Sequence, residues 1–298
     1  MAKGVQVRRH VVLILAVVTA LSLGASACGK KATTEPQGGG TTSGGETSAP
    51  PETTPAPEFT TLKDGELAVG SCLDYKPFEF TSPNSGELTG FDVEMMDAIA
   101  DKLGLKVTWV KANFNTIFTA LAANKFDAVA AASTITPERQ QVVDFSDPYF
   151  NSRQGFTVNT AKTPDIKSID DLKKGDVVGV QRGTTGAKFA QEKLASKGVT
   201  LKTYVTAPDA FTDLESGQTV GVMNDEGSSL SEAAGRPGLK VVQAIDTNEH
   251  YGFAVSKDNP KLLAAMNGAL KQIIADGTYA KIFKKWFPDL PVPPEFAG

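Results

Sequence analysis

Short apolar runs alternate with helically spaced apolar positions from residue 67 onward. In the first half, the runs predict strands at 67–70, 107–110 and 128–132. Apolar residues three and four positions apart predict helices at 93–103 and 117–121 between them. A strand–helix–strand–helix–strand order is typical of a mostly parallel sheet with right-handed crossovers. The first half therefore indicates one α/β lobe.

The second half repeats this alternation and then closes with helices. About 240 residues follow position 58, which is more than one small core needs and suits two lobes. The expected strands lie at 177–180, 201–205 and 220–223, and residues 252–255 start a closing segment. The expected helices lie at 186–196, 209–216, from Asn259-Pro260 onward, and 278–287. The pattern therefore predicts a second α/β lobe and a closing helical segment.

The segment Ser133–Arg139 carries the most chemistry of any short stretch. It follows the apolar run 126–132 and contains hydroxyls, free backbone groups and one guanidinium. Pro137 favours the first turn of a helix, with Thr136 as its cap. Such a helix N-terminus attracts an anion, and Arg139 offers the two-pronged donor that fits a carboxylate. A surface arginine in a capped turn is the alternative.

The N-terminus has the layout of an export signal. Lys3, Arg8 and Arg9 precede an apolar run at 11–23, which is too short for a comfortable membrane span. Small residues at 25–27 then lead to Cys28, as in bacterial lipoprotein signals, which this segment resembles. The resemblance implies cleavage of a signal peptide at 1–27 and lipidation of Cys28. An ordinary secretory signal is the alternative.

Residues 29–58 contain no Val, Ile, Leu, Met, Phe, Tyr or Trp. Such a composition cannot offset the entropy of ordering, so 28–58 is expected to be a disordered tether. A tether of this length fits a chain anchored by lipid to the outer face of the cell membrane.

Charge and residue counts exclude several functions. Removal of 1–27 takes away three basic residues and no acidic ones, which leaves a net charge of −7 and argues against nucleic acid. With Cys28 lipidated, Cys72 is the sole free cysteine, so no intrachain disulfide is possible. His250 is the sole histidine, which excludes His-based metal sites and Ser-His triads. No metal and no cofactor are expected.

Five motifs, in the expected order over residues 62–288, resemble the polar amino-acid-binding proteins of ABC importers, which are bacterial solute-binding protein family 3. The motifs are Tyr75–Phe80 with Gly90–Glu94, Thr134–Arg139 with Asp144–Tyr149, Gly179–Thr185, Asp276–Tyr279, and Lys285–Phe287.

The resemblance implies a periplasmic-binding-protein-like α/β fold. Two lobes with mostly parallel sheets would be joined by two crossover hinge segments. The first lobe would comprise 59–151 and 252–298, and the second lobe, with the hinge crossovers, would be 152–251. Parallel sheets bind ligands beyond the carboxyl ends of their strands, which agrees with a site between the lobes.

The resemblance also assigns binding roles to particular residues. Arg139 would bind the ligand carboxylate, helped by the Thr134 hydroxyl and by backbone N–H groups near Thr134 and Thr184-Thr185. The loop 183–186 precedes a helix, whose N-terminus favours the same anion. A simple capped turn is the alternative for this loop.

The ligand ammonium would be bound from the second lobe. Asp225 would accept it, with the carbonyl of Ala132 or Ser133 as a second acceptor. Asp225 could instead cap a helix that begins near Gly227. Tyr75 and Phe114 would enclose the ligand side chain.

Selectivity would depend on Cys72, Gln181 and Asn224. Several relatives that bind basic amino acids or glutamine carry an aspartate where this chain has Cys72, which weakens the case for a basic ligand. Because Gln181 and Asn224 are also neutral, an uncharged polar amino acid is expected. Arg182 or Arg153 could instead serve an acidic side chain.

The implied function is extracytoplasmic capture of a free amino acid by two closing lobes. The closed, monomeric protein would deliver it to an ABC permease powered by an ATPase. An amino-acid sensor for a signalling receptor and a dehydratase-type enzyme on the same fold are the alternatives. No paired-carboxylate motif for acid–base catalysis is apparent, so a non-enzymatic role is expected.

Overall fold

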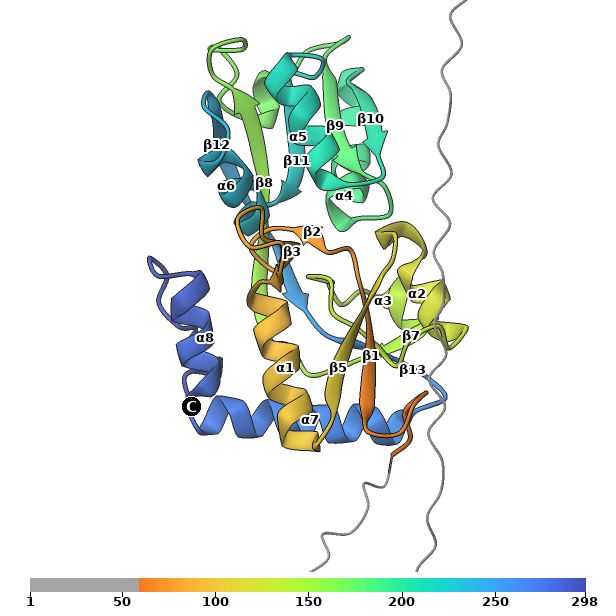
Figure 1. Ribbon diagram of the computed structural model, residues 1–298. Coiled ribbons are helices and arrows are strands. Elements are labelled where there is room, and N and C mark those ends of the chain that lie inside the picture. Colours follow the sequence, from red (N-terminus) through yellow and green to blue (C-terminus); the bar gives the residue numbers. More distant parts are fainter. Residues whose placement is uncertain (1–58) are drawn as a thin grey trace, which may run out of the picture. The chain divides into compact units, whose positions relative to one another are not determined.

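The computed structural model describes residues 59–298 (Figure 1). The predicted signal peptide, the lipidation site Cys28 and the predicted tether lie outside the described residues. Within the described part, two five-stranded sheets form the centres of two lobes.

The first lobe is built on the sheet β5-β1-β6-β13-β7. β5, β1 and β6 are parallel neighbours, whereas β13 is antiparallel to both β6 and β7. Four of the five strands therefore run in the same direction. The strands are β1 (Glu66–Ser71), β5 (Lys106–Lys111), β6 (Ala128–Val129), β7 (Val143–Phe145) and β13 (Ala254–Ser256).

The second lobe repeats this arrangement in the sheet β10-β9-β11-β8-β12. β10, β9 and β11 are parallel, and β8 alone runs against its neighbours. The strands are β8 (Phe150–Asn159), β9 (Val177–Gln181), β10 (Thr200–Tyr204), β11 (Gly221–Asp225) and β12 (Leu239–Tyr251). Both lobes are thus mixed but mostly parallel, and the predicted fold class is confirmed. The predicted lobe boundaries remain predictions.

The helices begin and end at residues with the expected capping chemistry. Thr136, Thr184 and Thr206 accept backbone N–H groups as N-caps of α3, α4 and α5. Gly104 and Gly217 end α1 and α5 in the left-handed conformation. The helices are α1 (Phe91–Leu103), α2 (Phe114–Ala122), α3 (Pro137–Gln140), α4 (Thr185–Leu194), α5 (Ala207–Ser216), α6 (Glu226–Ala234), α7 (Pro260–Ala275) and α8 (Thr278–Trp286), with 3₁₀ turns η1 (Ile169–Asp171), η2 (Ala195–Lys197) and η3 (Pro294–Phe296).

Two long strands cross between the lobes. β8 and β12 lie side by side as an antiparallel pair, from Leu239 opposite Asn159 to Tyr251 opposite Phe150 (Figure 1). Their register shifts between Ile245 and Glu249, where Asn248 has a positive φ. The sequence predicts crossovers here but not strands. Polar residues interrupt the apolar pattern of β12, and its exposed positions alternate with half-buried ones only over 244–248.

A small three-stranded sheet covers one end of the first lobe. Its strands are β2 (Asp74–Tyr75), β3 (Glu79–Thr81) and β4 (Leu88–Thr89). Phe78 precedes β3 and is fully buried, with its ring packed edge-on against Phe150 and Tyr251. This packing fixes β3 against the crossovers and brings the next residue, Glu79, into the interior.

The predicted strand 128–132 is too long at its C-terminal end. Only Ala128 and Val129 pair in the sheet, and Ala132 has a φ of 43°. The buried Asp92 carboxylate accepts the Ala132 N–H at 2.8 Å, which holds this left-handed turn. Asp92 lies 40 residues earlier in the chain, so the apolar run alone could not indicate the turn.

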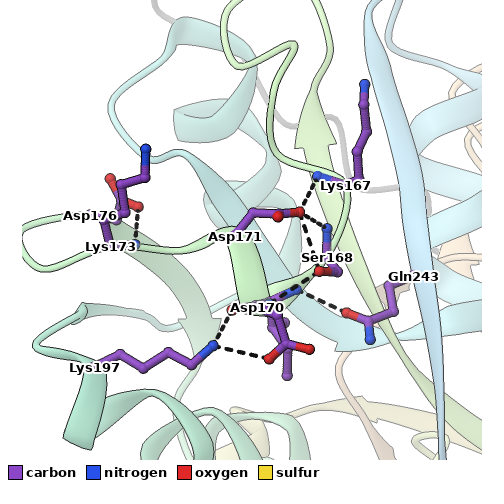
Figure 2. Close-up of polar contacts among 9 residues, drawn as sticks. Lys167, Ser168, Asp170, Asp171, Lys173, Asp176, Lys197 and Gln243 are labelled. Atoms are coloured by element: carbon purple, nitrogen blue, oxygen red, sulfur yellow. Dashed lines mark hydrogen bonds and ion pairs between the residues drawn. The ribbon is translucent and has the colours of Figure 1, made fainter.

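A polar cluster ties the long loop after β8 to its own lobe (Figure 2). The Asp171 carboxylate accepts the backbone N–H groups of Lys167 and Ser168, both at 2.9 Å. Lys197 donates to Asp170 at 3.1 Å, and the Ile169 N–H donates to Gln243 at 2.9 Å. Ser168 and Asp171 form a capping box, and the bonds from Lys197 and the Ile169 N–H stabilise it. The cluster is therefore structural rather than a binding site.

Candidate ligand-binding site

A cavity lies where the carboxyl ends of strands from the two lobes face each other. The first lobe contributes residues that follow β1, β5 and β6, and the second lobe contributes the ends of β9 and β11. The lining residues are Cys72, Tyr75, Glu79, Phe114, Ala131, Ala132, Thr134, Arg139, Gln181, Thr184, Thr185 and Asp225. All the binding residues predicted from the sequence line this cavity except Ser133 and Asn224.

Arg139 is held rigidly at the edge of the first lobe. Its guanidinium carbon lies 5.0 Å from the ring centres of both Phe114 and Phe118. It donates to the Thr134 carbonyl at 2.7 Å and to the Gly183 carbonyl of the second lobe at 3.3 Å. A guanidinium has five N–H donors, so donors remain for a ligand carboxylate. Arg139 is half-buried and lines the cavity, so the alternative of a plain surface arginine does not fit.

Asp225 ends β11 and receives three hydrogen bonds. The Tyr75 and Tyr251 hydroxyls donate to one carboxylate oxygen at 2.9 Å and 2.6 Å, and the Gln154 amide donates to the other at 2.7 Å. Burial, and then the charge of Glu249, raise the pKa of Asp225 to about 6. Asp225 stands at the N-cap position of α6, but its side chain makes no capping bond, so the side-chain capping alternative is wrong.

A second carboxylate, Glu249, connects the lobes. One of its oxygens accepts the hydroxyls of Thr134 and Thr185, each at 2.7 Å, and the other accepts the Gln154 amide at 2.9 Å. Thr134 belongs to the first lobe and Thr185 to the second. The Thr134 hydroxyl, which was predicted to face the ligand, and the Thr185 hydroxyl therefore converge on one carboxylate of the crossover β12. The sequence does not predict this convergence.

The second-lobe loop is a helix cap as well as part of the cavity wall. The Thr184 hydroxyl accepts the Ala187 N–H at 3.0 Å and donates to the Gln181 carbonyl at 2.8 Å. Gln181 is buried, and its amide donates to the Val205 carbonyl at 3.2 Å. The capped-turn alternative for 183–186 is thus confirmed and coexists with a place in the cavity lining.

Two predicted residues lie behind the lining. The Ser133 carbonyl already accepts the Gly252 N–H at 3.0 Å, which leaves Ala132 as the cavity-lining member of that pair. The Asn224 side-chain oxygen lies 3.1 Å from the Tyr75 hydroxyl, as an alternative acceptor to Asp225, and Asn224 is buried. Asn224 therefore positions Tyr75, and any effect it has on selectivity would act through that ring.

Cys72 lines the cavity as a buried free thiol. Burial raises the pKa of Cys72, and the negative charges of Glu79 and Asp74 raise it further. Glu79 and Ala131 also line the cavity, although neither was predicted to have a binding role. Glu79 lies within the first recognised motif, 75–80, and that was the one signal that could have pointed to it.

Among residues 59–298, no group of three or more His, Cys, Asp or Glu is arranged to hold a metal ion. None of the described helices combines the length and the apolar character that crossing a membrane requires.

Two α/β lobes joined by paired crossovers, with a cavity between the ends of their strands, define the periplasmic-binding-protein fold. Residues 67–289 match the sequence profile of the bacterial extracellular solute-binding proteins, family 3. The chain belongs to this family, and the resemblance stated from the motifs is confirmed.

Individual relatives agree with this assignment. The chain is 34% identical over 228 residues to ABC transporter arginine-binding protein 1 of Escherichia coli (strain K12), a match that covers 75% of this chain and 91% of the relative. It is 34% identical over 234 residues to ABC transporter glutamine-binding protein GlnH of Bacillus subtilis (strain 168), covering 77% and 84%. A solved ancestral arginine-binding protein bound to arginine is 41% identical, with a TM-score of 0.71 over 75% of this chain and 98% of that chain.

Proposed function

We propose that this protein captures a free amino acid outside the cytoplasm and delivers it to the permease of an ABC transporter. The observation that carries the proposal is the pairing of Arg139 and Asp225 in one cavity between the lobes. An amino acid presents a carboxylate and an ammonium, and these two side chains offer the opposite charges. Because the two come from different lobes, a ligand bound to both would favour the closed arrangement.

The remaining roles follow from this placement. Thr134, Thr184 and Thr185 would assist Arg139 at the carboxylate, while Ala132 and Asp225 would accept the ammonium. Tyr75 and Phe114 are nearly buried and line the cavity, so they would enclose the side chain. Taken by themselves, the neutral residues Cys72 and Gln181 favour an uncharged polar side chain.

Location and partners form a second part of the proposal. A lipid attached to Cys28 would hold the monomeric protein at the outer face of the membrane, and the tether would let it reach the permease. The motif resemblance and the two relatives from ABC transporters support delivery to a transporter rather than to a signalling receptor. We propose a binding protein and not an enzyme, so the ligand should be recovered unchanged after incubation.

Thermal unfolding of the purified protein with each of the twenty amino acids tests the proposal. A ligand at 100 times its dissociation constant should add about 2.7 kcal/mol to the free energy of unfolding. Arg139→Ala should abolish this shift and leave a folded protein. Arg182→Ala is the matched control, because Arg182 is exposed and lies outside the cavity lining. If no amino acid raises the melting temperature, the proposed function is wrong.

A further inference from the structure

Glu249 is a buried carboxylate whose acceptor sites are filled by groups of this chain. One oxygen accepts the hydroxyls of Thr134 and Thr185, each at 2.7 Å. The other accepts the Gln154 amide at 2.9 Å and the Thr247 hydroxyl at 2.7 Å. Because a carboxylate offers about four lone-pair sites, these donors saturate it. Glu249 therefore has no acceptor left for a ligand, and it does not belong to the cavity lining.

Two of these donors belong to different lobes. Thr134 follows β6 in the first lobe, whereas Thr185 begins α4 in the second lobe. Their hydroxyl oxygens lie 3.5 Å apart, and both donate to the same oxygen of Glu249. Opening of the lobes would pull these hydroxyls apart, so Glu249 could keep at most one of them. The bonds of Glu249 thus stabilise the closed arrangement through groups of the protein alone.

The backbone of β12 is shaped to direct Glu249 inward. The register with β8 shifts between Ile245 and Glu249, and Asn248 within the shift has a φ of 52°. The Asp246 carboxylate accepts the Asn248 N–H at 2.9 Å, which stabilises this irregular stretch. An irregularity of this kind re-aims a side chain relative to regular strand pairing. Asn248 is exposed while Glu249 is buried, as an inward-directed side chain requires.

Two other polar contacts between the lobes are weaker. Lys188 of the second lobe pairs with Glu138 of the first at 2.6 Å, but both side chains are more than half exposed. An exposed ion pair of this kind contributes little to stability. Arg139 donates to the Gly183 carbonyl at 3.3 Å, which is a single long bond. Of these contacts, only those of Glu249 join the lobes through a buried carboxylate.

We propose that Glu249 is a latch residue, whose bonds to Thr134 and Thr185 hold the two lobes closed before an amino acid binds. The latch positions the lobes and touches no ligand, so it changes the free energy of closing and not the contacts made to the amino acid. Affinity is then higher, because the binding-competent state is more populated, and entry is slower, because the lobes open less often. The inference rests on the proposed function only for these two consequences for binding.

The distance between the lobes in the ligand-free protein tests the latch directly. In the full-length chain, p-acetylphenylalanine replaces two exposed residues, Lys125 in the first lobe and Lys193 in the second. Its ketone takes a spin label and leaves the native cysteines untouched. Pulsed electron resonance then gives the distribution of distances between the labels, in which short and long distances report closed and open molecules.

Thr185→Val removes one hydroxyl donor, keeps the side-chain volume and leaves every charge in place. It should lower the ratio of closed to open ligand-free molecules at least about tenfold, because a hydrogen bond from the second lobe to a charged group is lost. Glu249→Ala should lower the ratio further, and Thr185→Val keeps the test decisive if Glu249→Ala fails to fold. Thr247→Val is the matched control. It removes a bond of the same length to Glu249 from the same crossover, so the ratio should not change.

Binding kinetics supply a readout that a purely structural role of Glu249 would not move. In stopped-flow experiments with the amino acid that binds most tightly, Glu249→Ala should raise the dissociation constant about tenfold and also raise the association rate constant. Damage to the fold or loss of a ligand contact would weaken binding without accelerating association.

The possible results separate the latch from the proposed function. An unchanged distance distribution in Thr185→Val, an equal shift in Thr247→Val, or an association rate constant that does not rise in Glu249→Ala would overturn the inference and leave the proposed function standing. Absence of binding by every amino acid would overturn the proposed function, while the distances in the ligand-free protein would still decide on the latch.

Discussion

Replacing Asp225 with asparagine should stabilise the ligand-free protein at neutral pH while weakening ligand binding. The pKa of this carboxyl is raised from 3.8 to about 6, first by burial and then by the charge of Glu249. This rise in the pKa corresponds to roughly 3 kcal/mol against the ionised form in the folded state. Because the folded carboxyl holds its proton more tightly than the unfolded one, this cost is absent below pH 4 and complete above pH 6.

Asparagine removes the charge and keeps the shape. Its amide oxygen can accept the two tyrosine hydroxyls that now bind one oxygen of Asp225, but its amide nitrogen would face the Gln154 amide. The lost hydrogen bond costs about 1–2 kcal/mol. The free energy of unfolding should therefore rise by about 1–2 kcal/mol at pH 7.5, and it should show no gain at pH 4.

Urea unfolding followed by tryptophan fluorescence at the two pH values measures this change, and calorimetry measures the binding. Affinity should fall roughly 30-fold or more, since the ligand ammonium loses its charged partner. Asp213→Asn is a control for which the free energy of unfolding should change in the opposite direction, because hydrogen bonds from Lys202 and Tyr204 lower the pKa of Asp213. That variant should lose stability at neutral pH. A less stable Asp225→Asn protein at pH 7.5, or one that binds with unchanged affinity, would refute the reasoning.

Four further outcomes are expected. Ligand affinity should fall about tenfold between pH 7 and pH 5, because binding needs the ionised Asp225, whose pKa is about 6; a flat calorimetric profile would contradict this. Glu249→Gln should move the midpoint of that profile to lower pH by removing the charge that raises the pKa of Asp225, and an unmoved midpoint would show that the two are not coupled. Gly70→Ala should lower the free energy of unfolding by about 1–3 kcal/mol, because its Cβ would lie 2.5 Å from the Phe126 ring. Gly268→Ala, in α7 with nothing within 4 Å, should instead gain about 0.5–1 kcal/mol in the same urea titration.

Periodicity predicted most helices and the parallel strands because their signals are local. Leu262, Met266 and Ile273 of α7 are fully buried, as their helical spacing indicates. The turn at Ala132 could not be predicted in this way, because a carboxylate 40 residues away holds it. The long strands β8 and β12 pair with each other, and their mixed polar pattern has meaning only once that pairing is known.

The residues of the candidate site show the same contrast between local sequence signals and contacts with distant parts of the chain. Arg139 was identified because a capped helix start and a guanidinium stand together within seven residues. Glu249 accepts a hydroxyl from a residue 115 positions away, and no local pattern marks it. Glu79 lies in a recognisable motif, yet neither of its carboxylate oxygens has a hydrogen-bond partner among the described residues, and this property of the folded interior cannot be derived from sequence spacing.

The chain order of the first sheet has a consequence for assembly. Strand β13, at 254–256, sits between β6 and β7, so that sheet lacks an inner strand until the last part of the chain has arrived. The second sheet draws all its strands from the continuous stretch 150–251, whose end residues Phe150 and Tyr251 are direct register partners. For a chain that emerges from its N-terminus, the second sheet can be complete while the first still exposes an open gap. The cavity, which needs both sheets, is then the last feature of the molecule to form.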